Sequence, residues 1–320
     1  MTRSMQGSEE TRRRLPEIGA PVISVVVCSY NSRRRIDRAL ISLRAQDIDE
    51  PYEVIVVDSG GDDAADYVRV AYPEARVIRS NRRLWPGPAR NAGVRAASGQ
   101  FVAFLPDDGV AKPDWLRRRV AMHREGFAAV GGSITNGTPL HPVGLAGYFL
   151  EYSALIPSDQ VLAEQEIPHC LSYDRLLFER LGTFPEETET GEDTLFNERL
   201  LAAKVKLGFD SRVQLDHLNL RRLVPYLRHQ YEHGRGLAKC VVQFGLASPI
   251  GPAEQGGITA AWRMFAFYPI RRWWNVLRRI ARGRRRWVPV YVAVSPLVWA
   301  GLWATSLGAW REWRRLRRGP

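Results

Sequence analysis

Acidic and polar side chains follow three apolar segments of the chain, at the point where each segment ends. Ser29, Tyr30 and Asn31 follow the first segment, Asp58 follows the second, and Asp107 and Asp108 follow the fourth. A carboxylate such as Asp58 can accept hydrogen bonds from a base or a ribose. Two adjacent carboxylates can hold a hard divalent cation whose other ligands are phosphate oxygens and water. The three strand ends therefore predict a site for a phosphorylated ligand.

A second acidic pair, Glu192 and Asp193, opens a helical pattern over residues 192–203. The charges could simply stabilise the helix dipole, by about 0.3–1 kcal/mol. Alternatively, a carboxylate placed beside a reactive donor could take the proton of an acceptor hydroxyl. An equally simple alternative holds for Asp58 by itself, because an Asp after a strand often serves as a turn or N-cap residue. That alternative explains the joint pattern at three strand ends less well.

The elements that would position these side chains alternate along the chain. Apolar runs over 22–28, 53–57, 76–78 and 101–105 predict strands buried on both faces, and residues 127–135 predict another strand that is interrupted by two glycines. Helical patterns cover 36–43, 63–71, 89–97 and 113–124, and then 175–181 and 192–203, before a strand over 205–209. This order predicts the α/β class, with a doubly wound, mostly parallel sheet that binds ligands beyond the carboxyl ends of its strands. We expect Asn31 or Ser32 to cap the first helix and residues 136–168 to be rich in loops.

Five short motifs resemble, in order and spacing, those of the family 2 glycosyltransferases, which have the GT-A fold. The resemblance covers roughly residues 23–220, and its motifs are residues 25–31, 56–60, 86–93, 104–108 with 112–116, and 191–195. One position departs from the family pattern, because Pro106 stands where the first acid of the usual Asp-x-Asp motif would be. The acids are then Asp107 and Asp108, and Asp108 matches the family's usual metal contact.

The resemblance implies a role for each candidate residue. The implied catalytic residues are Asp193, as the base of an inverting reaction, and Glu192. The implied metal ligands are Asp108 and His217. The implied donor-binding residues are Ser29, Tyr30, Asn31, Asp58, Arg90 and Asp107. The implied cofactor is Mn²⁺ or Mg²⁺, and the implied donor is a nucleotide sugar, most typically a UDP-sugar, with GDP or dTDP as alternatives. Without the resemblance, His217 is equally well a core or surface histidine and Arg90 a helix-surface arginine.

The processivity of the reaction is also indicated by the resemblance. Residues 231–236 resemble the Tyr-x-x-Gly-Arg stretch of non-processive family members. The Gln-x-x-Arg-Trp motif of the processive synthases is absent from the sequence. A non-processive transferase is therefore predicted.

Composition places the chain among globular proteins and separates one region from the rest. The 320 residues are 45% hydrophobic and 25% charged, which excludes disordered, collagen-like and coiled-coil classes. The three cysteines form no CxxC pair, so neither a disulfide framework nor a cysteine zinc site is predicted. Residues 262–320 hold 14 arginines, one acid and eight of the ten tryptophans, whereas the whole chain has a net charge of +12. Arginine mixed with tryptophan favours a membrane interface over nucleic acid.

These features predict three regions. Residues 1–20 form a polar, disordered leader, residues 21–222 form the GT-A catalytic domain, and residues 223–320 form a helical membrane-associating region. Within the last region, residues 223–236 and 260–282 are amphipathic, and residues 288–310 carry no charge and are long enough to cross a bilayer. Because prolines interrupt this segment and arginines flank both its ends, a re-entrant or interface-lying arrangement stays open.

The predicted function is that of a membrane-associated inverting glycosyltransferase of cell envelope polysaccharide synthesis. It would transfer a sugar from a nucleotide-sugar donor to a hydroxyl or to a lipid-linked acceptor of the polyprenyl-phosphate type. We expect it at the cell membrane, with its catalytic domain on the cytoplasmic side. One alternative is a catalytically inactive GT-A-like scaffold, which Pro106 favours. Another is a nucleotidyltransferase, although residues 31–35 lack the glycine-rich loop typical of that class.

Overall fold

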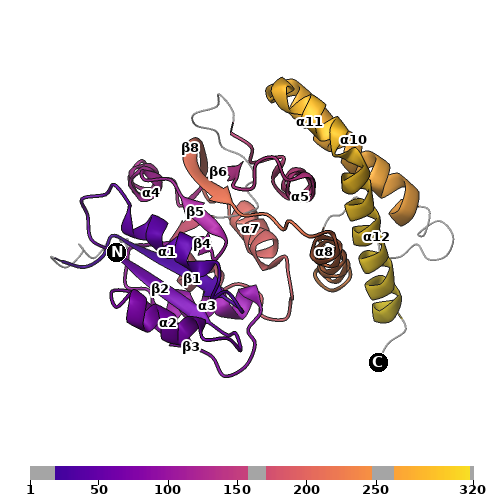
Figure 1. The fold of residues 1–320 in the computed structure, drawn as a ribbon. Coiled ribbons are helices and arrows are strands. Elements are labelled where there is room, and N and C mark those ends of the chain that lie inside the picture. Colours follow the sequence, from indigo (N-terminus) through magenta and orange to yellow (C-terminus); the bar gives the residue numbers. More distant parts are fainter. Residues whose placement is uncertain (1–18, 158–170, 247–262, 318–320) are drawn as a thin grey trace, which may run out of the picture.

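The computed structural model describes residues 19–157, 171–246 and 263–317. The predicted leader lies outside these residues except for its last two positions. One eight-stranded sheet has the strand order β3-β2-β1-β4-β7-β6-β8-β5. The strands are β1 (Ile23–Ser29), β2 (Tyr52–Asp58), β3 (Arg76–Arg79), β4 (Phe101–Pro106), β5 (Gly109–Ala111), β6 (Ala129–Asn136), β7 (Ser172–Asp174) and β8 (Leu207–His217). The sheet occupies one side of the molecule, and the C-terminal helices lie on the other (Figure 1).

The first four strands form the parallel half of the sheet. β1 lies between β2 and β4, β3 pairs with the outer edge of β2, and all three pairings are parallel. Val25, Val26 and Val27 are completely buried, as a strand covered on both faces requires. The connecting helices are α1 (Ile36–Arg44), α2 (Ala64–Ala71), α3 (Pro86–Ala96) and, after β5, α4 (Trp115–Arg124). Each lies close to the predicted helical segment.

The second half of the sheet mixes strand directions. β7 is antiparallel to both β4 and β6, β8 is parallel to β6, and the short strand β5 is antiparallel to β8. Four of the seven pairings are therefore parallel, and the predicted α/β class with a mostly parallel sheet flanked by helices is confirmed. β8 is longer than the predicted strand over 205–209, and its pairing brings His217 beside Gly109 at the start of β5.

The predicted N-cap of the first helix is wrong. The N-cap position of α1 is Arg35, which makes no side-chain capping bond. Asn31 is instead in the left-handed region, with φ 50°, and its Oδ1 accepts a hydrogen bond from the backbone N of Gly61. The hydroxyl of Ser32 pairs with that of Ser29. Asn31 thus joins the turns after β1 and β2, and the hydroxyl of Ser32 is bonded to the last residue of β1.

Residues 142–152, which lie in the segment expected to be loops, form the helix α5 (Pro142–Tyr152). A proline in the first turn starts this helix, and every residue from 143 to 150 is buried. The segment has no amphipathic pattern because most of its faces pack against protein, which explains why periodicity did not reveal it. Residues 158–168 of the same predicted loop lie outside the described residues.

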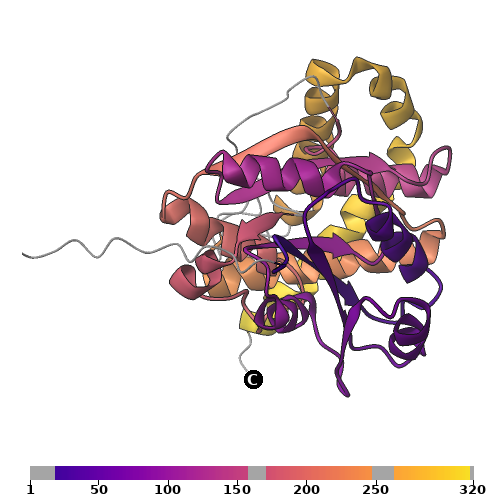
Figure 2. The ribbon, with the colours of Figure 1, turned by 90° about the vertical axis from the view of Figure 1, so that its left-hand side faces the viewer.

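Helices α6 (Leu176–Leu181) and α7 (Glu192–Ala202) follow β7, and α8 (Leu223–Phe244) follows β8. The C-terminal region then continues through the π-helical turn η1 (Arg263–Phe267), α10 (Tyr268–Gly283), the short 3₁₀ turn η2 (Arg285–Trp287), α11 (Val288–Ala293) and α12 (Ser295–Arg317). Figure 2 shows these helices gathered beside the sheet domain.

The uncharged segment 288–310 is divided between α11 and α12. Pro289 and Pro296 lie in the first turns of these two helices, a position that proline favours. Among the described residues, no single helix is long and apolar enough to cross a membrane. Segments 285–293 and 295–317 meet these requirements only as a pair, and the pair is bent by 74°.

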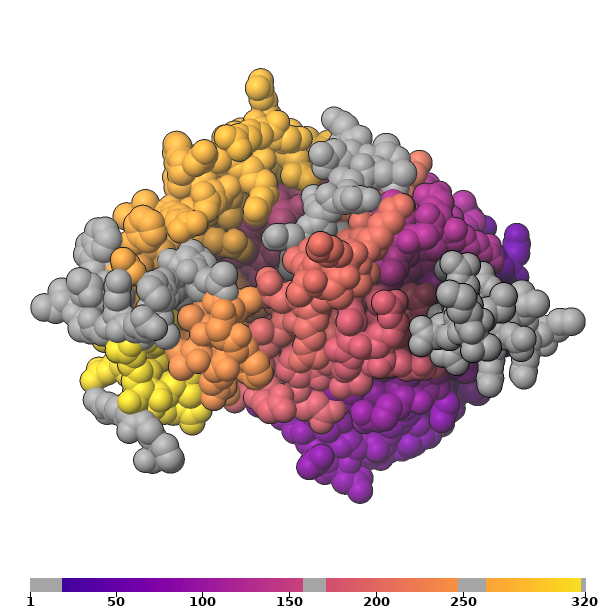
Figure 3. Space-filling model, turned by 180° about the vertical axis from the view of Figure 1, so that it is seen from behind, coloured from indigo at the N-terminus to yellow at the C-terminus, as the bar shows by residue number. Residues whose placement is uncertain are grey.

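Helices α8 and α12 approach each other through glycines. A Cβ atom on Gly308 would lie 2.0 Å from the carbonyl oxygen of Tyr231, and one on Gly234 would lie 1.9 Å from that of Thr305. An ion pair between Arg235 Nε and Glu312 Oε2, 3.0 Å long, adds to this contact, which we call the α8–α12 seam. The space-filling view shows the C-terminal helices lying directly against the rest of the molecule (Figure 3).

Candidate active site

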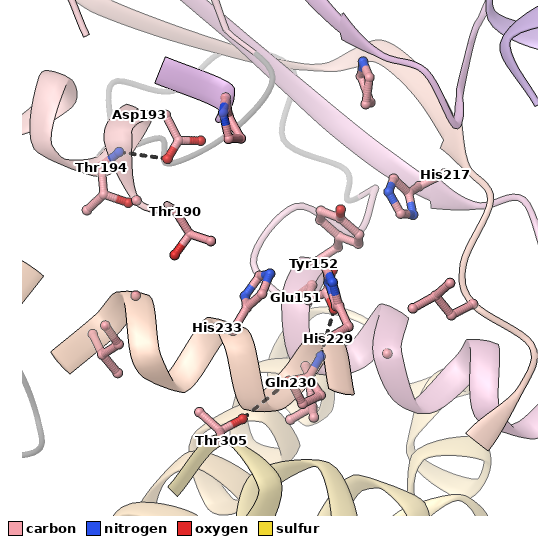
Figure 4. A pocket seen from close by; sticks show the side chains of 18 of the residues that line it. Glu151, Tyr152, Thr190, Asp193, Thr194, His217, His229, Gln230, His233 and Thr305 are labelled. Carbon is pink, nitrogen blue, oxygen red and sulfur yellow. Dashed lines mark hydrogen bonds and ion pairs between the residues drawn. The ribbon is translucent and has the colours of Figure 1, made fainter. Parts of the chain in front are cut away.

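A cavity of about 670 Å³ lies between the carboxyl ends of the strands and the helices α5, α8 and α12. It brings together five of the residues identified from sequence: Arg90, Asp108, Glu192, Asp193 and His217. These residues come from four separate segments of the chain, and part of the cavity is shown in Figure 4. The other five predicted residues are not among the lining residues. Four of them lie at the neighbouring ends of β1 and β2, namely Ser29, Tyr30, Asn31 and Asp58. The fifth, Asp107, lies beside Asp108.

Asp58 has a buried oxygen atom that lacks a partner. Its side chain is completely buried, and Oδ1 accepts hydrogen bonds from the hydroxyl of Ser29 at 2.7 Å and from Gly60 N at 3.4 Å. The described residues provide no hydrogen-bond partner for Oδ2. A buried acceptor that is left unsatisfied destabilises the fold by about 1–3 kcal/mol. This geometry suits an N–H or O–H donor supplied by a bound ligand.

Tyr30 belongs to a stack of planar groups near the same strand ends. The guanidinium of Arg83 lies 4.4 Å from the ring centre of Tyr30 and 3.9 Å from that of Trp85. Tyr30 is 38% exposed, so part of its ring faces solvent. The stack gives this rim of the site flat, cationic and aromatic surfaces.

The adjacent carboxylates of Asp107 and Asp108 have different partners. Arg35 Nη2 donates to Asp107 Oδ2 at 2.9 Å. Burial and the neighbouring Asp108 carboxylate nevertheless raise the pKa of Asp107 to about 6. Asp108 Oδ1 lies 3.3 Å from Nε2 of His217. Burial would raise the pKa of Asp108, but His217 outweighs it and holds that pKa below its usual value.

Asp108 and His217 are suited to hold a divalent cation together. Both side chains line the cavity, and a carboxylate oxygen with an imidazole nitrogen is a donor set that Mn²⁺ accepts. Within the described ranges, no three His, Cys, Asp or Glu side chains come together as a complete metal site. The remaining ligands would therefore be diphosphate oxygens and water, as hard cations commonly arrange.

Glu192 and Asp193 occupy the first turn of α7. Gly191 precedes them in the left-handed conformation, with φ 84°, which glycine adopts without steric cost. Arg90 Nη1 lies 2.5 Å from Glu192 Oε1 and 3.7 Å from Asp193 Oδ2. The backbone N of Thr194 donates to Asp193 Oδ1 at 2.8 Å. Arg90, predicted to reach phosphate, thus lies against these carboxylates and fixes their position.

Several polar residues of the cavity were not identified from sequence. They are Arg35, Glu151, Tyr152, His229, Gln230 and Thr305. Glu151 and Tyr152 fall in the segment expected to be loops. His229 and His233 are four residues apart on α8, a spacing that places both on one helical face and could have indicated a shared role.

Comparisons with known proteins agree with this geometry. The model of the family described as "Glycosyl transferase family 2" matches residues 24–181. The chain is 42% identical over 102 residues to the succinoglycan biosynthesis protein ExoO of Rhizobium meliloti, covering 31% of this chain and 29% of that protein. It is 25% identical over 224 residues to the glycosyltransferase AglE of Haloferax volcanii, covering 68% of this chain and 73% of AglE. The match to ExoO thus spans less than a third of that relative.

Solved structures show the same fold. The mannosyltransferase PcManGT of Pyrobaculum calidifontis, solved in complex with GDP-Man and Mn²⁺, is 18% identical, with a TM-score of 0.59 and coverage of 91% of this chain and 87% of that one. Residues 1–349 of TarS from S. aureus are also 18% identical, with a TM-score of 0.52 and 91% coverage of both chains. The family model, the relatives and the shared fold lead to one conclusion: through residues 24–181, this chain belongs to glycosyl transferase family 2 and has the GT-A fold.

Proposed function

We propose that this protein is an inverting, metal-dependent glycosyltransferase that moves a sugar from a nucleotide-sugar donor to an acceptor hydroxyl. One observation carries the proposal: the Asp108–His217 pair and the carboxylate of Asp193 line the same cavity. A cation-binding pair and a separate base are the two functions that this transfer requires. An inactive scaffold is the alternative, because the first acid of the motif is missing. That alternative does not explain why the site keeps both the cation-binding pair and the base.

The proposed reaction forms one bond and breaks another at the anomeric carbon of the donor. Asp193 takes the proton of the acceptor hydroxyl as its oxygen attacks that carbon from the side opposite the leaving group. The bond between the anomeric carbon and the diphosphate oxygen breaks, so the configuration inverts. Asp108 and His217 would hold Mn²⁺ or Mg²⁺, whose charge stabilises the departing diphosphate when it is bound. Arg90 and Thr194 keep the Asp193 carboxylate in place.

A UDP-sugar is the donor that we propose first. The unpartnered Oδ2 of Asp58 is suited to accept the N–H of a uracil. TarS has been solved with UDP-GlcNAc, whereas PcManGT was solved with GDP-Man, so GDP- and dTDP-sugars stay in the test. For the acceptor, a relative that is 28% identical over 117 residues is named as a glucosyltransferase acting on a diphosphate-linked undecaprenol glycan. We therefore propose a glycan or lipid-linked glycan acceptor.

The experiment compares the purified wild-type protein with Asp193→Asn. Thermal shifts with UDP-, GDP- and dTDP-sugars and Mn²⁺ identify the donor, because a ligand that binds the folded state raises the melting temperature. Nucleotide release is then measured with and without Mn²⁺. We expect turnover of the Asn variant to fall by roughly 10²–10⁴, the usual contribution of a general base. A protein that binds no donor, or an Asn variant with wild-type turnover, would contradict the proposal, and diphosphate release from a nucleoside triphosphate would indicate a nucleotidyltransferase.

We also propose that the protein lies on the cytoplasmic face of the cell membrane through α10 and α12. A row of neighbouring indoles joins these helices in the order Trp274, Trp273, Trp299 and Trp303, with centroid separations of 6.3, 6.1 and 5.8 Å; the first two pairs are stacked and the third is tilted. Trp274 and Trp303, at the two ends of this tryptophan row, are 50% and 54% exposed. Tryptophan favours the membrane interface, and the exposed arginines of α10 would be attracted to anionic lipids by about 1 kcal/mol each.

Vesicle sedimentation tests this attachment. The double variant Trp274→Ser, Trp303→Ser should bind phosphatidylglycerol-containing vesicles several-fold more weakly than the wild type. Val70→Ser is the control, because Val70 is 83% exposed but lies on α2 of the sheet domain. Equal sedimentation of the double variant and the wild type would exclude the tryptophan row as the contact.

A further inference from the structure

The cavity carries a second group of polar side chains that the proposed chemistry does not use. They come from three helices and are Glu151 of α5, His229, Gln230 and His233 of α8, and Thr305 of α12. We call this group the inner polar cluster. In Figure 4, Asp193 and Thr190 lie on one side of the open space, and the inner polar cluster lies across it. A molecule held by the cluster would therefore face the proposed base.

The carboxylate of Glu151 is the centre of the inner polar cluster. His229 Nε2 lies 3.1 Å from Glu151 Oε1, and Gln230 Nε2 donates to the same oxygen at 2.7 Å. Both contacts that the described residues make to this carboxylate go to Oε1. Because an ionised carboxylate has about four lone-pair sites, Oε2 keeps acceptor capacity for a ligand.

The charge of Glu151 is maintained despite its burial. Burial would raise the pKa of Glu151, but the positive charge and hydrogen bond of His229, with His233 and His217 nearby, lower that pKa to about 2. The side chain is only 15% exposed. The cluster therefore holds an ionised carboxylate at neutral pH, which accepts hydrogen bonds from hydroxyl groups.

Gln230 joins Glu151 to the C-terminal helix α12. Gln230 is 4% exposed, and its Oε1 lies 3.4 Å from the hydroxyl of Thr305, which also donates to the carbonyl of Gly301 at 3.0 Å. The amide nitrogen of Gln230 is directed at Glu151. The position of the carboxylate thus depends on α12 as well as on α5 and α8.

Aromatic side chains complete this end of the cavity. The ring of Tyr152 lies 4.7 Å from that of His217, so it connects the proposed cation pair to the inner polar cluster. Tyr226 and Tyr268 line the cavity as well. Planar hydrogen-bonding groups beside aromatic rings match a sugar, which has hydroxyls at its edge and apolar C–H groups on its faces.

We propose that the inner polar cluster is the acceptor subsite, that it takes a sugar ring, and that Glu151 accepts hydrogen bonds from hydroxyls of that ring. The inference rests on the proposed function and names the acceptor class: a glycan hydroxyl rather than a polyprenyl phosphate oxygen. In a lipid-linked acceptor, the terminal sugar would occupy the cluster and the phosphates would lie elsewhere.

In the test, the full-length enzyme is supplied with the donor identified by thermal shift. A panel of p-nitrophenyl glycosides is offered as acceptors, and farnesyl phosphate is offered in a separate assay. We expect transfer to at least one glycoside. In Glu151→Gln, the KM for that glycoside should rise at least tenfold relative to the KM for the donor. Glu53→Gln is the matched control, because Glu53 is also partly buried and holds Ser24 and Ser98 at the opposite end of β2. Its ratio of the two KM values should equal that of the wild type.

Three results would overturn the acceptor subsite: transfer to farnesyl phosphate alone, donor hydrolysis without transfer to any glycoside, or an unchanged KM ratio in Glu151→Gln. Should Glu151→Gln fail to fold, Glu151→Asp withdraws the carboxylate from the proposed sugar by one methylene and must also raise the KM ratio. A wild-type enzyme that neither hydrolyses nor transfers any donor contradicts the proposed function instead, so the two failures are distinguishable.

Discussion

Arg90 and Glu192 form an ion pair of 2.5 Å between Nη1 and Oε1, although the side chain of Glu192 is only 4% exposed and that of Arg90 only 21%. One guanidinium from α3 thus fixes the start of α7, where the proposed base lies. The pair explains how a carboxylate in the first turn of a helix can be buried: its charge is matched by an arginine from a separate segment of the chain.

Removing one partner of this pair should destabilise the protein. Glu192→Gln leaves the Arg90 guanidinium with Asp193 alone, and breaking a buried pair in this way typically costs about 3–5 kcal/mol. Because Asp193 lies 3.7 Å away and compensates in part, we expect a loss near the lower value in urea unfolding. Glu187→Gln, an exposed change in the same loop, is the control. Equal unfolding midpoints for the two variants would show that the pair contributes little.

The two adjacent acids after β4 should respond differently to substitution. Asp108→Asn removes a proposed cation ligand that faces His217, so Mn²⁺-dependent UDP binding should weaken at least tenfold by calorimetry. Asp107→Asn should change that affinity by less than about threefold, because the Asp107 carboxylate is directed to Arg35. Equal losses of UDP affinity in the two variants would argue that the acids act as a unit. Unchanged UDP binding in Asp108→Asn would show that Asp108 is not a cation ligand.

The buried His123 should make the fold sensitive to acid. Its Nδ1 lies 2.8 Å from the carbonyl of Phe127 and its Nε2 lies 2.8 Å from the hydroxyl of Ser172. Burial lowers the pKa of His123 from 6.5 to about 3. Between these values the unfolded chain binds one more proton, so the contribution to stability is complete above pH 6.5 and is lost as the pH falls, at about 1.4 kcal/mol per pH unit.

Urea unfolding at several pH values checks this effect. The slope of unfolding free energy against pH, between pH 6 and 4, should become shallower in His123→Gln than in the wild type. His141→Gln, at the less buried N-cap of α5, serves as the control and should keep the wild-type slope. A steep slope that persists in His123→Gln would assign the acid sensitivity to other groups.

The α8–α12 seam should not accept even one extra methyl group. Gly308→Ala places a Cβ 2.0 Å from the carbonyl oxygen of Tyr231, so the two helices must separate. Overpacking of this kind typically costs about 1–3 kcal/mol. In Gly283→Ala, the added Cβ has no neighbour within 4 Å, and we expect no loss of stability. Thermal unfolding of the two variants compares them directly, and a Gly308→Ala protein as stable as Gly283→Ala would show that the seam is loosely packed.

The sequence predicts those parts of the fold and the site that depend on local patterns along the chain. The buried strands β1, β2 and β4 and the acids at their ends follow from apolar runs and from the rule that ligands bind at carboxyl ends of strands. The inner polar cluster could not be predicted in this way, because Glu151 meets His229 across 78 positions of the chain and Thr305 meets Gln230 across 75. The ion pair of Arg90 and Glu192 escaped prediction for the same reason.

The C-terminal helices show a different limit. Their arginine and tryptophan content predicts attachment to lipid. The glycines of the α8–α12 seam carry no such compositional signal, although they decide how closely α12 approaches α8. The role of α12 in lining the cavity follows from tertiary packing and not from any local pattern.

The participation of α12 in the cavity also has a consequence for biosynthesis. Phe244, the last residue of α8, precedes Thr305 by 61 residues. At about 5–20 residues per second, translation of this interval takes roughly 3–12 s. During that time a nascent chain holds its proposed base and cation ligands while the face of α8 that α12 will cover remains open to chaperones, to lipid or to other nascent chains.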